Sequence, residues 1–142
     1  MGSFKHTGLT EKIIGAFFQV YNTLGYGFLE KVYENALALE LRKSGLQVEQ
    51  QKPIAVYYDD RIVGEYFADI VVNGVVLLEL KAVRQLVREH KAQLLNYLKA
   101  TTIEVGLLLD FGVKAEVVRR AFDNDRKGSL KWISKWDAEE RG

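Results

Sequence analysis

The chain has 142 residues, of which 48% are hydrophobic and 27% charged, with 20 basic against 19 acidic side chains. This composition is that of a globular domain with a real core, and a net charge of +1 gives no general attraction for nucleic acid. There are no cysteines and only two histidines, so thiolate and histidine-rich metal sites are not expected. Carboxylates would have to hold any metal, which favours Mg²⁺, Mn²⁺ or Ca²⁺.

The chain carries no targeting or membrane signal that we can identify. No run approaches the roughly 18 apolar residues of a membrane span, and the first residues lack the apolar segment of a signal peptide. We therefore expect a cytoplasmic protein without membrane contact.

The hydrophobic pattern predicts a single domain over residues 1–142, with a core at about 9–122 and a C-terminal extension over 123–142. Helical periodicity predicts helices over 9–24, with Thr10 as N-cap, 28–43 and 86–99. Apolar runs and alternation predict strands over 48–58, 61–72, 75–82, 104–111 and 116–122. The order ααβββαβ(β) indicates an α/β or α+β domain with a mixed sheet.

Three charged residues interrupt two of the apolar strands: Asp69 in the strand over 61–72, and Glu79 and Lys81 in the strand over 75–82. Charged groups in such positions are costly unless something binds them. Two acids beside one lysine can hold a hard divalent cation and a water that attacks phosphate. An exposed sheet face with solvated neighbours is the alternative explanation.

The register of the hairpin between these strands decides whether the two acids meet. A two-residue loop of Asn73 and Gly74 would pair Asp69 with Leu78 and place the acids on opposite faces. A three-residue loop centred on Gly74, or a bulge, would pair Asp69 with Glu79. The hypothesis of a metal site therefore predicts an odd loop or a bulge.

The chemistry of such a site follows from its residue types. Asp69 and Glu79 would supply anionic oxygens for Mg²⁺, and the Leu80 carbonyl is a possible further ligand. The metal would lower the pKa of a bound water and neutralise charge on the phosphate. Lys81 would orient or help to deprotonate that water and stabilise the developing charge.

Two further pairs of polar residues stand at helical spacing. Gln93 and Tyr97 lie four residues apart, on one face of their predicted helix. Glu30 and Tyr33 lie three apart just after Gly27, where Glu30 also suits the first turn of a helix. Taken alone, these pairs are also explained by a solvated helix face and by first-turn electrostatics.

Together these motifs resemble a known family. Asp69, Glu79-Leu80-Lys81 and the segment 93–97 resemble the D…ExK…QxxxY pattern of RecB-type nucleases in the PD-(D/E)XK superfamily. The segment 27–33 matches the G-x-x-E-x-x-Y signature of the GxxExxY family within it. The resemblance spans about residues 9–122, and it departs from the pattern at Ala68, where a proline would precede the aspartate.

The resemblance implies a restriction-endonuclease-like core, a mixed sheet flanked by helices, with a metal-dependent phosphodiesterase site that uses Mg²⁺ or Mn²⁺. By this resemblance, the acids Asp69, Glu79 and Glu30 would bind the metal, and Lys81 would be the catalytic lysine. Gln93 and Tyr97 would support them with an amide and a phenol. Tyr33 would be a supporting residue.

These observations favour a nuclease that hydrolyses phosphodiester bonds, in DNA, by in-line attack of a metal-activated water. A junction-resolving endonuclease and a non-catalytic module that binds nucleic acid or protein are the alternatives. The chain could also form a homodimer, or bind a protein partner that supplies the positive charge that it lacks.

Three smaller features also stay open. His90 could reach a phosphate or take part in proton transfer, or it could be a partly buried helix residue. Four basic residues on the third helix and its approach are candidates for backbone contacts: Arg84, Arg88, Lys91 and Lys99. A C-terminal group could stack on bases, form a dimer contact or pack against the domain: Trp132, Ile133 and Trp136.

Overall fold

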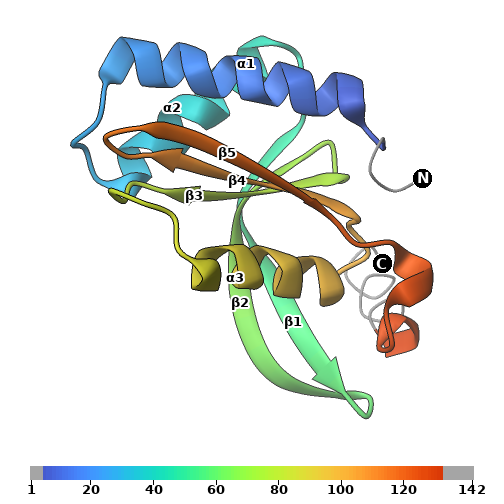
Figure 1. The fold of residues 1–142 in the computed structure, drawn as a ribbon. Coiled ribbons are helices and arrows are strands. Elements are labelled where there is room, and N and C mark those ends of the chain that lie inside the picture. Colours follow the sequence, from blue (N-terminus) through green and yellow to red (C-terminus); the bar gives the residue numbers. More distant parts are fainter. Residues whose placement is uncertain (1–4, 133–142) are drawn as a thin grey trace.

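The computed structural model describes residues 5–132, which form a five-stranded mixed sheet with helices on both faces (Figure 1). The strands lie in chain order, β1-β2-β3-β4-β5, and only β3 and β4 pair in parallel. The elements are α1 (Thr7–Leu24), α2 (Glu30–Lys43), β1 (Val48–Tyr58), β2 (Arg61–Val72), β3 (Val76–Lys81), α3 (Arg88–Lys99), β4 (Val105–Phe111), β5 (Ala115–Ala121) and a 3₁₀ turn (Asn124–Arg126). Ile133 and Trp136 lie outside the described residues.

The predicted order of elements is confirmed, and most boundaries agree within two residues. The N-cap prediction for Thr10 was wrong, because α1 begins at Thr7 with His6 as its N-cap. The backbone N–H of Thr10 already donates the helical hydrogen bond to the His6 carbonyl at 2.9 Å. Its side chain is buried, and its hydroxyl donates to the Thr7 carbonyl of the same helix at 3.0 Å.

The sheet separates two hydrophobic cores. One lies between the sheet and the pair α1 and α2, where Phe17 and Tyr33 pack with Leu80 and Phe111. The other lies between the sheet and α3, on the opposite face (Figure 1), and contains Leu77 of β3 with Leu94 and Leu98 of α3. Since side chains of a strand alternate, Glu79 and Lys81 point to the α3 face, like Leu77.

The hairpin between β2 and β3 has the loop that a metal site requires. Ile70 pairs with Leu78 and Val72 with Val76, so residues 73–75 form a three-residue loop centred on Gly74. The Val75 N–H donates to the Val72 carbonyl at 3.0 Å and closes the turn. Continued by one pair, this register places Asp69 opposite Glu79, as the odd-loop prediction requires.

On the N-terminal side of Asp69, β2 no longer pairs with β3 and remains paired with β1 alone. The two strands form an arm, defined here as residues 52–68, that runs past α3 and ends in the turn at residues 59–60 (Figure 1). A register shift lies between Val56 and Tyr57. The site of Asp69 is therefore the point where the sheet divides.

The chain after β3 packs closely on the end of β4 before α3 begins. A Cβ atom on Gly112 would lie 1.8 Å from the Val83 carbonyl oxygen, so only glycine fits at this position. Within residues 5–132, no helix is long and apolar enough to cross a membrane.

Candidate active site

Asp69 and Glu79 are held together by each other's backbone, where β2 separates from β3. The Asp69 N–H donates to Glu79 Oε1 at 3.1 Å, and the Leu80 N–H donates to Asp69 Oδ2 at 2.8 Å. The two carboxylates thus accept N–H groups that a continued ladder would give to backbone carbonyls. The predicted meeting of the two acids is present in the structure.

Burial makes the negative charge of this pair costly. Glu79 is only 6% exposed, and burial, followed by the charge of Asp69, raises the pKa of its carboxyl to about 8. Burial also raises the pKa of Asp69, although the Leu80 N–H opposes the effect. In the absence of a bound metal ion, this raised pKa favours the protonated form of Glu79 at neutral pH.

Glu30 and Lys81 complete the group that we call the acid–lysine cluster: Glu30, Asp69, Glu79 and Lys81. Glu30 is the first residue of α2, where the helix dipole favours a carboxylate. Burial raises the pKa of Glu30, the charge of Lys81 lowers it and the charge of Asp69 raises it. Glu30 therefore lies close enough to Lys81 and Asp69 to interact with both charges. Three acids share one lysine, which leaves an excess of negative charge when all are ionised.

Tyr33 fixes the loop that presents Glu30. Its fully buried hydroxyl donates to the Gly25 carbonyl at 2.6 Å and accepts the Phe28 N–H at 3.1 Å. Its ring stacks on Phe111 with centroids 4.5 Å apart. These contacts are those of a supporting residue rather than a reacting one.

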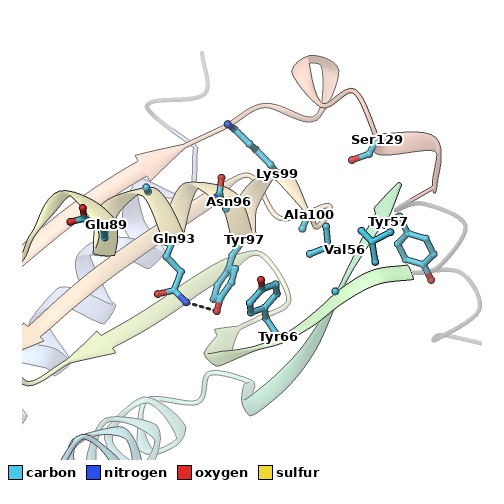
Figure 2. Close-up of a pocket in the computed structure, with 13 residues that line it drawn as sticks. Val56, Tyr57, Tyr66, Glu89, Gln93, Asn96, Tyr97, Lys99, Ala100 and Ser129 are labelled. Atoms are coloured by element: carbon cyan, nitrogen blue, oxygen red, sulfur yellow. Dashed lines mark hydrogen bonds between the residues drawn. The ribbon is translucent and has the colours of Figure 1, made fainter. Parts of the chain in front are cut away.

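Gln93 and Tyr97 meet on α3, and Tyr97 extends toward the cluster. Gln93 Nε2 donates to the Tyr97 hydroxyl at 2.7 Å (Figure 2). Burial raises the pKa of Tyr97, and the charges of Glu79 and Asp69 raise it further. The phenol therefore lies within the field of the two strand carboxylates, with Gln93 holding its hydroxyl.

Gln51 and Glu34, which the sequence analysis did not select, hold Asp69 from the other side. Gln51 Nε2 donates to Glu34 Oε1 at 2.8 Å and to Asp69 Oδ1 at 3.3 Å. The Gln51 backbone takes φ 53°, which is uncommon for a residue other than glycine. Glu34 is buried and lies one helical turn after Glu30, a spacing that could have identified it.

Asp110 is a second acid that the sequence analysis passed over. It pairs in register with Lys81, is almost fully buried, and accepts the Val83 N–H on Oδ1 at 2.9 Å. Its Oδ2 has no hydrogen-bond partner among residues 5–132. Burial raises the pKa of this carboxyl. It interrupts an apolar strand as Asp69 and Glu79 do, so the same criterion would have found it.

His90 lies near the cluster but has a structural contact of its own. It is half-buried, and its Nδ1 accepts the Val87 N–H at 3.1 Å at the start of α3. Its charge lowers the pKa of Glu30 and of Asp110, so the ring is close to both.

The remaining open features lie on the surface around α3. Arg84, Arg88 and Lys99 are exposed, and Lys91 is half-buried. The Trp132 ring packs edge-on against Tyr58 at the tip of the arm, with centroids 6.1 Å apart.

The donor set of the cluster fits a hard divalent cation with incomplete protein ligation. Carboxylate oxygens suit Mg²⁺ and Mn²⁺, and a cation would offset the burial and the repulsion by Asp69 that raise the pKa of Glu79. Within the described part of the chain, no group of three or more His, Cys, Asp or Glu side chains is arranged as a ligand set. Water and a backbone carbonyl would have to complete the coordination, as is usual for Mg²⁺.

The sequence matches the PD-(D/E)XK nuclease superfamily over residues 7–121, and the chain belongs to this superfamily. Two solved structures share the fold. The crystal structure of SSO0001 is 16% identical, with a TM-score of 0.53 over 79% of this chain and 59% of that one. An alkaline exonuclease (LHK-Exo) from Laribacter hongkongensis is 15% identical, with a TM-score of 0.50 over 78% of this chain and 66% of that one.

The predicted fold class is thereby confirmed: the mixed sheet with flanking helices is the restriction-endonuclease-like fold. This chain spans roughly three fifths to two thirds of the length of those two chains. No curated protein matches the sequence.

Proposed function

We propose that this protein is a Mg²⁺- or Mn²⁺-dependent nuclease that hydrolyses phosphodiester bonds in DNA, with the acid–lysine cluster as its active site. One observation carries the proposal. Asp69 and Glu79 meet at the division of the sheet, bonded through each other's backbone, with the pKa of Glu79 raised to about 8. Such a pair costs the fold stability, which points to a functional use of its charge.

Asp69, Glu79 and the Leu80 carbonyl would hold the metal. Since the Leu80 N–H points toward Asp69, its carbonyl faces the same side, where β2 has left the ladder. When bound, Mg²⁺ or Mn²⁺ supplies a water of lowered pKa and a positive charge for the phosphate. Gln51 and Glu34 keep the Asp69 carboxylate in its orientation.

Lys81 would be the catalytic lysine of the site. It is half-buried and lies on the same face of β3 as Glu79. Its ammonium would orient the attacking water and stabilise the negative charge that builds on the phosphate oxygens. Tyr97, held by Gln93, would donate a hydrogen bond to the same phosphate or to that water.

We further propose that the chain is a member of the GxxExxY family. The three residues that define the signature act together: Gly27 takes φ 114°, Tyr33 ties the loop to α2, and Glu30 enters the cluster. Glu30 would approach the metal directly or through a water.

A binding module without catalysis is the second candidate. The net charge of +1 and the absence of a three-ligand group within residues 5–132 favour it. Such a module would need no metal and would not depend on Lys81.

The test is cleavage of plasmid, linear duplex, single-stranded and branched DNA, with RNA alongside, by the wild type, Glu79→Ala and Lys81→Ala. The proposal predicts cleavage that needs Mg²⁺ or Mn²⁺ and is lost in both variants. Preference for branched DNA would identify a junction-resolving enzyme. Cleavage that survives in both variants would place the active site elsewhere, and no cleavage of any substrate would favour the binding module.

A further inference from the structure

The arm and α3 form the walls of a pocket of about 630 Å³ (Figure 2). Its volume is within the range of pockets that bind small organic ligands. The residues on which the argument rests come from both walls: Val56, Val63 and Tyr66 from the arm, and Gln93, Asn96 and Tyr97 from α3. The proposed hydrolysis uses Tyr97 and Gln93 of this lining and gives the rest of the pocket no role.

Tyr97 connects the pocket to the cluster. It lines the pocket, and it packs in the same buried cluster as Ala68, which precedes Asp69, and Leu77, which shares a strand face with Glu79. Burial raises the pKa of its hydroxyl, and the charges of Glu79 and Asp69 raise it further. A nucleotide adjoining the cleaved phosphate could therefore place its base in the pocket.

The walls offer the contacts that a nucleobase needs. The Tyr66 ring is 48% exposed and lies 5.6 Å from the Tyr97 ring at an angle of 44°, so the two rings are not stacked on each other. A planar ligand can therefore stack on Tyr66. The amides of Gln93 and Asn96 carry both donors and acceptors for the edge of a base.

We propose that this pocket binds the base of an unpaired nucleotide next to the cleaved phosphate, so that the substrate is single-stranded nucleic acid or a single-stranded region. The inference rests on the proposed nuclease function and adds its substrate class. A paired base in a duplex stack shows only its edges and would have to be flipped out to enter. A base in a single strand has its faces free for the tyrosine.

The charge of the protein agrees with this mode of binding. The net charge is +1, and the ionisable groups that line the pocket are Lys99, Glu89 and the tyrosines. Affinity would therefore come from stacking more than from phosphate contacts. We expect a shallow dependence of affinity on salt, because few counterions are released.

The test compares Tyr66→Leu with Phe67→Leu. These aromatic residues are neighbours on β2, point to opposite faces and are 48% and 55% exposed, but only Tyr66 lines the pocket. Fluorescence anisotropy in EDTA measures binding of three probes: a short labelled oligothymidylate, an abasic strand of equal length and a blunt duplex. Thermal unfolding checks that both variants fold.

We expect wild type and Phe67→Leu to bind the oligothymidylate about tenfold or more tightly than the abasic strand or the duplex. Tyr66→Leu should lose this preference, with a matching rise in KM and an unchanged kcat in Mg²⁺. Equal affinity of both variants for the oligothymidylate, or tightest binding of the duplex, would overturn the pocket assignment.

The two proposals can fail separately in this experiment. If wild type cleaves DNA in Mg²⁺ or Mn²⁺ while both variants behave alike, the pocket assignment is wrong and the nuclease stands. If wild type neither binds nor cleaves any nucleic acid, the nuclease proposal fails and the pocket assignment fails with it.

Discussion

The burial of Glu79 predicts a protein that becomes less stable as the pH rises. The pKa of this carboxyl goes from 4.5 to about 8 on folding, so between these values the folded state holds a proton that the unfolded chain has released. The free energy of unfolding therefore falls from pH 4.5 to 8 and stays low above it. At about 1.36 kcal/mol per pH unit, the full loss is roughly 5 kcal/mol.

Glu79→Gln removes the charge and keeps the contact, because the amide oxygen can still accept the Asp69 N–H. We expect the metal-free variant to be more stable than wild type at about pH 9, by roughly 3–5 kcal/mol. For a domain of this size the melting temperature should rise by about 10 °C. Below about pH 4 the difference should vanish, because the carboxyl is then protonated in both states.

The assay is thermal and urea unfolding followed by circular dichroism in EDTA, repeated across this pH range. Glu116→Gln serves as the control: Glu116 is exposed on β5, and this variant keeps Glu79, so its stability should follow that of wild type across the range. A Glu79→Gln variant that is no more stable than wild type at high pH would refute the reasoning. It would mean that the ionised carboxylate has a stabilising partner within the fold.

Four other outcomes follow from the contacts. Mn²⁺ well above the dissociation constant of wild type should raise the melting temperature of wild type at pH 8 by several degrees and that of Glu79→Gln by clearly less; an equal rise in both would show that this carboxyl does not bind the metal. Tyr33→Phe should cost about 1–3 kcal/mol in urea unfolding, because the hydroxyl joins two backbone groups; a neutral effect would remove its anchoring role. Gly112→Ala should destabilise severely, while Gly15→Ala, in open space within α1, should stabilise by about 0.5–1 kcal/mol; similar melting temperatures would contradict the packing. Burial lowers the pKa of Lys127 to about 8, so wild type should gain stability over Lys127→Met from pH 8 to 10.5; a gap independent of pH would show that the ammonium is not desolvated.

The sequence predicted those parts of the fold that depend on local pattern. The boundaries of β1 and β2 agree with the predicted strands, because alternation and turn residues bracket both. The three-residue loop followed from the requirement that Asp69 and Glu79 share a face. The N-cap expected at Thr10 is absent, because a threonine within the first turn can donate to a helix carbonyl instead of capping the helix.

The candidate site was predictable where an acidic residue interrupts an apolar strand. Asp69 and Glu79 stand out as acids in apolar strands, and Asp110 would have stood out by the same test. Gln51 could not be found, because its role depends on a positive φ and on the division of the sheet beside it. The pocket could not be predicted from the sequence either, since its walls come from segments that only the tertiary fold brings together.

The most direct test of the proposed metal site is calorimetric titration of Mn²⁺ into wild type, Glu79→Gln and Asp110→Asn at pH 7 in buffers of different ionisation enthalpy. Asp110 is a buried acid that pairs in register with Lys81, and the proposal gives it no ligand role, so it serves as the matched control. We expect wild type and Asp110→Asn to bind Mn²⁺ with release of about one proton, because Glu79 must ionise. Glu79→Gln should bind at least tenfold more weakly and release no proton. Absence of Mn²⁺ binding by wild type, or equal binding by Glu79→Gln, would contradict a metal site at Asp69 and Glu79.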